Sequence, residues 1–196
     1  MNKNKTITMN LKRTIYSLFL AIAISFSSIA NTTNPENDKD KTAKTTKEEK
    51  TIVGVAAGNE NFTTLVAAVK AAGLVDVLSS KGPFTVFAPV NDAFGKLPEG
   101  TVANLLRPEN KELLTAILTY HVVAGEFKAA AVIKAIKDNN GTFVITTVQG
   151  GKLTASLKDG KVILTDVKGN VSTIIITDVA ASNGVIHAID SVVMPQ

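Results

Sequence analysis

Apolar and polar residues follow two different periods along this chain of 196 residues. From about residue 60 to residue 140, apolar side chains mostly recur three or four positions apart, the spacing of a helix with one buried face. From Gly141 onward, apolar and polar side chains alternate, which is typical of a strand with one face against the core. Helices followed by antiparallel strands predict an α+β fold.

The helical period is clearest between Phe62 and Val69, whose apolar positions form one stripe. Asn61 precedes this stripe as a candidate N-cap, and Gly73 is placed to end the helix. A longer helix is expected to begin at Pro108, because proline is favoured in the first turn. The remaining predicted helices cover residues 74–78, 102–106 and 129–136.

One apolar run of the first half has the composition of a strand instead. Phe84 to Ala88 are mostly aromatic and β-branched residues, as a strand buried on both faces requires. Pro89 lacks the N–H that a sheet needs, so the strand is expected to end there. Asn91 or Asp92 is then expected to cap the next short helix.

The second half divides into strands separated by turn residues. Lys152 to Lys158 alternate strictly between polar and apolar side chains. Asp159-Gly160 is a favoured two-residue hairpin turn, which returns the chain into the next strand. The other predicted strands cover residues 143–148, 161–165, 171–179 and 185–194.

The first thirty residues have the layout of a secretory signal peptide. Four cations, ending at Arg13, precede an apolar run, and small residues up to Ala30 provide a cleavage site. A retained membrane anchor is the alternative, but serines interrupt the run before it reaches the ~20 apolar residues of a spanning helix. We therefore expect an exported protein, located in a periplasm, outside the cell or at the cell surface, without a membrane span after cleavage.

Composition separates residues 31–50 from the remainder of the chain. This segment is rich in Lys, Glu, Asp, Asn and Thr and has almost nothing to bury, so it is predicted to be a disordered charged linker. Residues 51–196 are enough for one domain with a substantial core. The chain contains no cysteine, so an exported domain must be stable without disulfides.

Charge argues against binding to nucleic acid. The whole chain has a formal charge of +4, but its four amino-terminal cations account for all of this excess. The part from Asn31 onward has 17 basic and 17 acidic residues and is formally neutral. It also has one arginine and no tryptophan, so no basic surface for phosphates is expected.

No catalytic or cofactor-binding motif is evident. The two histidines are 66 positions apart, and the absence of cysteine leaves no ligand spacing typical of zinc. The chain has neither a Gly-x-Ser-x-Gly turn nor a phosphate-binding glycine loop. We therefore expect a protein that is not an enzyme and needs no metal or cofactor.

Several ordered motifs resemble the fasciclin-like domain family. The stretch 82–94, the pair Tyr120-His121, the segment 147–153 and the stretch 183–195 occur in the family's order, and the likeness extends from about Ile52 to Pro195. The signature residues are Phe84, Thr85, Phe87, Ala88, Pro89, Asn91 and Phe94 in the first block and Asn183, Gly184, His187, Asp190 and Pro195 in the last. The resemblance implies a wedge of two antiparallel β-sheets with several helices packed around it. It also implies a single fasciclin-like domain over residues 51–196, without catalytic activity.

The same resemblance identifies candidate partner-binding residues. In some animal members a Tyr-His pair flanked by branched apolar residues is tied to integrin binding, and here it is Tyr120-His121. An Asp-Ile pair is also implicated, and here it is Asp178-Val179, with a shorter apolar partner. Val90 replaces the Thr or Ser that is usual in the first block.

Elementary chemistry supplies a structural alternative for these residues. The sequence around Tyr120 and His121 is mostly apolar, so both side chains are expected at the edge of the core, each with a hydrogen-bond partner. His187 is flanked by apolar residues and is expected to be structural as well. Asp178 and Asp190 can accept hydrogen bonds from backbone N–H groups at strand ends.

Two functions remain open. The first is an adhesion or matrix-interaction module that binds a protein or a glycan at the cell surface. The second is a periplasmic protein that binds a lipid or metabolite, or an envelope stress protein. In either case we expect a monomer.

Overall fold

The computed structural model describes residues 50–196. The predicted signal peptide and all but the last residue of the predicted linker lie outside this range. Seven strands of the described part form a continuous sheet in the order β2-β1-β7-β6-β5-β4-β3. The strands are β1 (Phe84–Pro89), β2 (Val122–Ala124), β3 (Thr142–Thr146), β4 (Lys152–Lys158), β5 (Lys161–Thr165), β6 (Val171–Ala181) and β7 (Gly184–Ile189).

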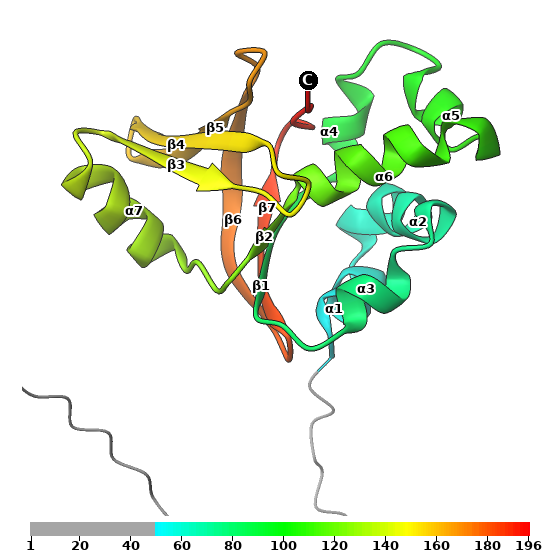
Figure 1. Cartoon of the computed structure of the whole chain (residues 1–196), viewed down its shortest axis with the longest axis horizontal. Coiled ribbons are helices and arrows are strands. Elements are labelled where there is room, and N and C mark those ends of the chain that lie inside the picture. The colour runs from blue at the N-terminus through cyan, green and yellow to red at the C-terminus, as the bar shows by residue number, and fades with distance from the viewer. Residues whose placement is uncertain (1–49) are drawn as a thin grey trace, which may run out of the picture. The chain divides into compact units, whose positions relative to one another are not determined.

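Helices precede and flank this sheet. The α-helices are α1 (Ile52–Ala57), α2 (Thr63–Ala72), α3 (Val75–Ser79), α4 (Asn91–Gly95), α5 (Thr101–Leu105), α6 (Lys111–Tyr120) and α7 (Ala129–Asp138). Two short 3₁₀ turns, η1 (Glu60–Phe62) and η2 (Pro108–Asn110), lead into α2 and α6. Figure 1 shows α1 to α6 gathered beside β1 and β2, and α7 under β3 and β4. The predicted α+β fold, with helices first and strands later, is confirmed.

The two sheets of the predicted wedge are linked through the long strand β6. Its first residues pair with β5, and its later residues pair with β7, with two register shifts along this pairing. Five of the six strand pairings are antiparallel, and the pairing of β1 with β7 is parallel. This parallel pair was not predicted, because the two strands are about a hundred residues apart and the alternation pattern carries no information on direction.

Apolar side chains form two cores. The first, which we call the helical core, lies between the helices and one face of β1, β2 and β7, and includes Phe62, Leu65 and Leu118. The second, the sheet core, lies between the sheets and α7, and includes Phe87, Ile136 and Leu164. Val132 and Ile136 of α7 belong to this second cluster, so α7 covers the inner face of β3 and β4.

Most predicted elements are present, but their ends differ. β1 includes Pro89, which is buried and pairs with Ile189, and β7 ends at Ile189 instead of residue 194. The sequence interpretation missed α1 and the three-residue strand β2. These elements are too short to display a period of their own, so only their packing in the tertiary structure defines them.

Gly73 ends α2 in the left-handed conformation, as predicted, but the predicted N-caps were wrong in detail. Asn59, and not Asn61, supplies the side-chain cap at η1, where its Oδ1 accepts from the Asn61 N–H at 3.0 Å. The helix α4 has no side-chain cap, although Asn91 and Asp92 stand in its first turn.

The Asn91 side chain serves a different helix. Its Oδ1 accepts hydrogen bonds from the Thr64 N–H (3.0 Å) and from the Thr63 hydroxyl (3.1 Å) at the start of α2. Its Nδ2 donates to the Glu60 carbonyl at 2.8 Å. Asn91 therefore satisfies an N–H at the first turn of a helix 27 residues earlier in the chain.

Candidate functional site

The two signature blocks lie side by side in the structure. They form the parallel pair β1 and β7, with Phe84 opposite Gly184 and Phe87 opposite His187. The Phe87 and His187 rings are stacked with centroids 5.8 Å apart. A Cβ at Gly184 would lie 2.0 Å from the Phe84 carbonyl oxygen, so only glycine permits this close approach of the two strands.

Most of the signature side chains are buried. Thr85, Phe87, Ala88, Pro89, His187 and Pro195 belong to the interior, together with Asn183, while Phe84, Asn91, Phe94, Gly184 and Asp190 are half-buried. Asn183 accepts from the Ile52 N–H at 2.8 Å and donates to the Leu78 and Ser80 carbonyls, each at 2.8 Å. This one amide therefore joins the start of β7 to α1 and to the end of α3.

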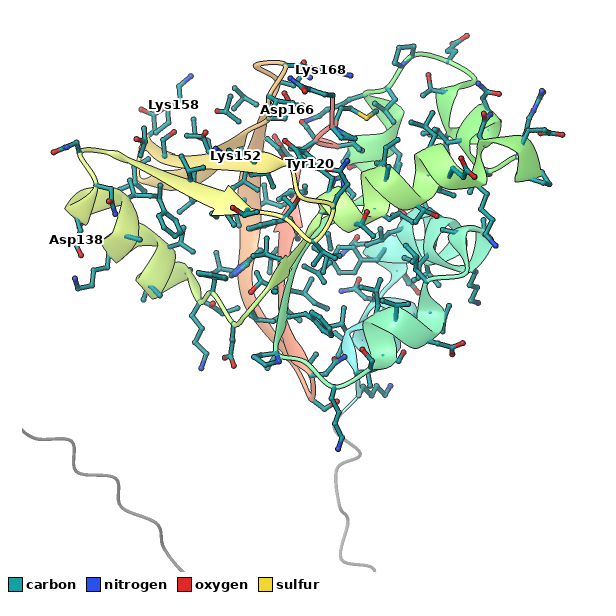
Figure 2. All side chains as sticks on the ribbon, viewed as in Figure 1. Tyr120, Asp138, Lys152, Lys158, Asp166 and Lys168 are labelled. Atoms are coloured by element: carbon teal, nitrogen blue, oxygen red, sulfur yellow. The ribbon has the colours of Figure 1, made fainter. Side chains whose placement is uncertain are left out.

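Tyr120, the first of the predicted partner-binding residues, is fully buried at the end of α6. Its hydroxyl donates to the Lys152 carbonyl at 2.6 Å, at the start of β4. Figure 2 shows Tyr120 beside Lys152 in this part of the domain. A Cβ at Gly151 would lie 2.5 Å from the tyrosine ring, so this glycine leaves the space that the ring occupies. Burial raises the pKa of Tyr120.

His121 is also buried, with only 2% of its surface exposed. Its Nε2 accepts from the Val193 N–H at 3.3 Å, so the proton is on Nδ1, which donates to the Ile117 carbonyl at 2.8 Å. Burial lowers the pKa of His121 to about 4, although the hydrogen bond to Ile117 acts in the opposite direction. The neutral ring therefore connects the end of α6 to the segment after β7.

Asp178 and Val179 lie in an irregular part of β6, where the register with β7 shifts between Ile176 and Val179. Asp178 is exposed and has a positive φ of 56°, and Val179 is half-buried. The Asp178 carboxylate Oδ1 accepts from the Ala129 N–H at 2.9 Å, at the first residue of α7. Its own N–H donates to His187 Nδ1 at 3.2 Å.

His187 and Thr85 also form side-chain hydrogen bonds to backbone groups of the segment before α7. Because His187 Nδ1 is an acceptor, Nε2 carries the proton and donates to the Phe127 carbonyl at 2.7 Å. The Thr85 hydroxyl donates to the Gly125 carbonyl at 2.7 Å and accepts from the Phe127 N–H at 2.8 Å. Thr85, Asp178 and His187 form a unit, here called the α7 anchor, that holds this helix on the sheet.

The four predicted partner-binding residues therefore do not form one surface. Tyr120 and His121 are bonded to backbone groups in the interior, whereas Asp178 is exposed and belongs to the α7 anchor. Of the four, only Asp178 and Val179 are accessible to a partner in this conformation.

Two further carboxylates stabilise the carboxyl-terminal segment. Asp190 accepts from the Thr173 N–H at 2.8 Å and lies 3.2 Å from the Lys96 ammonium group. Burial alone would raise the pKa of Asp190, but hydrogen bonds from Thr173, Lys96 and Ser191 outweigh it and lower the pKa. The same balance lowers the pKa of Asp166, whose carboxylate accepts four hydrogen bonds.

The sequence interpretation missed an exposed apolar segment beside Asp178. Ile175 is 46% exposed and Ile176 is 42% exposed. A sequence cue was present, since three consecutive isoleucines, 174–176, cannot all face the same side of a regular strand. We call Ile175, Ile176, Asp178 and Val179 the β6 ridge.

Within residues 50–196, the more enclosed apolar cavity is too small for a metabolite, and two larger hollows, of about 510 and 470 Å³, are open to solvent. An apolar cavity of about 30 Å³ lies between α1, α2 and the sheet, with His121 in its lining. It has room for about two water molecules, whereas sites for metabolites and drugs enclose ~300 Å³ or more. Within residues 50–196, no three acidic or histidine side chains are close enough to bind a metal ion. None of the helices in this range has both the length and the apolarity that crossing a bilayer requires.

Known proteins resemble this chain in sequence and in fold. A model of the fasciclin domain matches residues 60–195. Protein sll1483 of Synechocystis sp. is 58% identical over 145 residues, which cover 74% of this chain and 73% of the relative. Immunogenic protein MPB70 of Mycobacterium bovis is 44% identical over 149 residues, which cover 73% of this chain and 68% of the relative.

A similar fold occurs in the FAS1 domain pair of the insect cell adhesion molecule Fasciclin I, with a TM-score of 0.64 and 18% identity. The match covers 72% of this chain and half of that domain pair. At this identity the likeness concerns the fold alone. Because the family model matches most of its length, this chain belongs to the fasciclin domain family.

Proposed function

We propose that this protein is an exported, non-enzymatic binding module that acts in adhesion at a cell surface or in an extracellular matrix. Three features support the proposal: the sequence of residues 1–30, the family to which the chain belongs, and a fold shared with a cell adhesion molecule. The polar groups of the signature blocks hold secondary-structure elements together, so they are not free for catalysis.

The observation that carries the proposal is the β6 ridge. Its two isoleucines are each more than 40% exposed, and contiguous exposed apolar side chains mark candidate contacts for another molecule. Residues of β6 on both sides of the ridge pair with β7, so the ridge is anchored to the sheet at both ends. We assign the partner contact to this ridge in place of Tyr120 and His121, which are buried.

Adhesion to immobilised protein tests the proposal. The purified full chain and its Ile176→Ser variant are coated on a surface and exposed to washed bacterial cells and to purified matrix proteins. We expect the parent to retain at least one of these partners and the variant to lose most of the binding, because a central apolar contact has been removed.

Leu113→Ser provides the matched control, because Leu113 is 52% exposed on α6, far from β6 in sequence. It removes a similar apolar area and should leave binding unchanged. Equal losses in both variants would contradict the assignment to the ridge. A parent that retains neither cells nor matrix proteins would contradict the adhesion function itself.

A further inference from the structure

One face of the sheet formed by β3, β4, β5 and the start of β6 has no cover within residues 50–196. The inner face packs against α7 and the sheet core, so the outward side chains are on the side away from α7. Figure 1 shows α7 on one side of β3 and β4 and no helix of the described part on the other. The residues of this outer β face are Thr142, Val144, Thr146, Lys152, Thr154, Ser156, Lys158, Lys161, Ile163, Thr165, Val171 and Thr173.

The outer β face presents its side chains in two cross-strand rows. Strand register places Val144, Thr154, Thr165 and Val171 in one row, and the next row runs from Thr142 to Thr173. Each row crosses four strands, a width of about 14 Å at the usual strand spacing. The two rows contain both hydroxyl groups and branched apolar groups, and all of these side chains are exposed or half-buried.

Charge on this face has one sign. Lys158 and Lys161 are directly opposite each other across β4 and β5, and Lys152 stands at the other end of β4. None of the outward positions is acidic. Figure 2 shows Lys158 on the side of the strands away from α7, and Asp138 on the α7 side.

Two aspartates lie near this face without neutralising it. Asp166, next to the strand β5, is 5% exposed, and its carboxylate accepts hydrogen bonds from the Lys168 N–H, from Asn170 and from the Met194 N–H. Asp159 is in the hairpin turn between Lys158 and Lys161, so these residues together retain a net positive charge.

We propose that the outer β face binds an acidic polysaccharide, a chain of sugars that carry hydroxyl and carboxylate groups. The lysines attract the carboxylates, and the rows of Thr and Ser provide donors and acceptors for sugar hydroxyls. A protein partner is disfavoured, because the face contains no aromatic residue, methionine or arginine, the residues enriched in protein interfaces. A single-stranded nucleic acid is disfavoured for the same reason, since its bases stack on aromatic side chains.

Affinity electrophoresis with polygalacturonate in the gel tests the inference on the full chain. We expect the acidic polymer to retard the protein and the neutral polymer dextran to leave its mobility unchanged. The double variant Lys158→Gln/Lys161→Gln should bind polygalacturonate about tenfold more weakly, because two exposed ion pairs are lost. The double variant Lys70→Gln/Lys111→Gln, on α2 and α6, has the same net charge and should bind as the parent does.

Thr154→Glu tests the centre of the face, and the added carboxylate should also weaken binding about tenfold. Equal loss in both lysine pairs would overturn the inference, because only net charge would then matter. Binding of duplex DNA as tight as that of polygalacturonate would overturn it too, as would no retardation by the acidic polymer.

This inference rests on the proposed binding function and names one class of partner for it. The two ideas can fail separately, because they involve different surfaces. If Ile176→Ser abolishes adhesion while polygalacturonate fails to bind the parent, only the polysaccharide inference is wrong. If polygalacturonate binds the outer β face and no cell or matrix protein is retained, the inference holds and adhesion through the β6 ridge is wrong.

Discussion

The buried neutral state of His121 predicts a specific dependence of stability on pH. Its pKa is about 4 in the folded protein and about 6.5 in an unfolded chain. Between these values the unfolded state binds the proton and the folded state does not, so stability increases with pH. The contribution is complete above about pH 6.5 and is lost as pH falls toward 4.

The size of this effect follows from the two pKa values. Lowering the pH from 7.5 to 5 should reduce the free energy of unfolding by about 2 kcal/mol, and the full loss by pH 4 and below is about 3 kcal/mol. Asp166 and Asp190 also have lowered pKa values, but their contributions are lost only as pH falls through about 4 and below. The window from pH 5 to 7.5 therefore separates the histidine from these carboxylates.

Urea denaturation of the parent and of His121→Gln at several pH values measures the effect. Glutamine keeps an acceptor for the Val193 N–H but has no titratable group, so the variant should be less stable at pH 7.5 and should lose less of its stability by pH 5. If the two proteins lose stability in parallel over this window, His121 does not titrate as the buried geometry requires.

Three other substitutions test the packing and the contacts around the signature blocks. Phe87→Ala should lower the free energy of unfolding by about 3–5 kcal/mol in urea melts, because the ring is 1% exposed; a loss below about 2 kcal/mol would contradict its burial. Asn91→Ala should cost about 1–2 kcal/mol, because it leaves an N–H at the start of α2 without its partner. Asp92→Ala, on an exposed neighbour, should cost much less, and equal costs would contradict the contact to α2. Gly151→Ala should cost about 1–3 kcal/mol, because the new methyl group meets the buried tyrosine ring. A thermal melt measures this cost. Gly95→Ala, at a position with open space around it, is the control and should leave the melting midpoint nearly unchanged.

The polar signature residues share one structural role. Each of Thr85, Asn91 and Asn183 uses its side chain to satisfy backbone groups of a segment far away in the chain. A short polar side chain is suited to this task, because it can complete hydrogen bonds that a buried helix end or loop would otherwise lack. The polar residues of the two blocks therefore hold the domain together, and binding is assigned to surfaces outside them.

Local patterns were sufficient for much of the fold. The apolar stripe from Phe62 to Val69 and the alternation from Lys152 to Lys158 predicted α2 and β4, because one buried face imposes a period on the sequence. The hairpin at Asp159-Gly160 was also predicted correctly, and both residues have the positive φ that this turn requires. The resemblance in the signature blocks identified the family, which the match to the fasciclin domain then confirmed.

Contacts between distant residues could not be read from such patterns. Asn91 was expected to cap the helix in which it stands, but tertiary packing brings α2 within reach of its amide. The side chains of Tyr120 and His121 were candidates for a partner, and in the fold they bond to backbone groups of β4 and of the segment after β7. Only the placement of β4 and of the segment after β7 against α6 decides which backbone group each of these two side chains meets.

The sequence by itself therefore determined the fold class, the family and most of the helices and strands, because one-sided burial and turn chemistry are local properties. The tertiary structure alone decided that the two signature blocks pair in parallel through β1 and β7. It also decided which surfaces remain open, the β6 ridge and the outer β face. The physical reason is that exposure depends on which elements pack against one another, and α7 can cover only one face of β3 and β4.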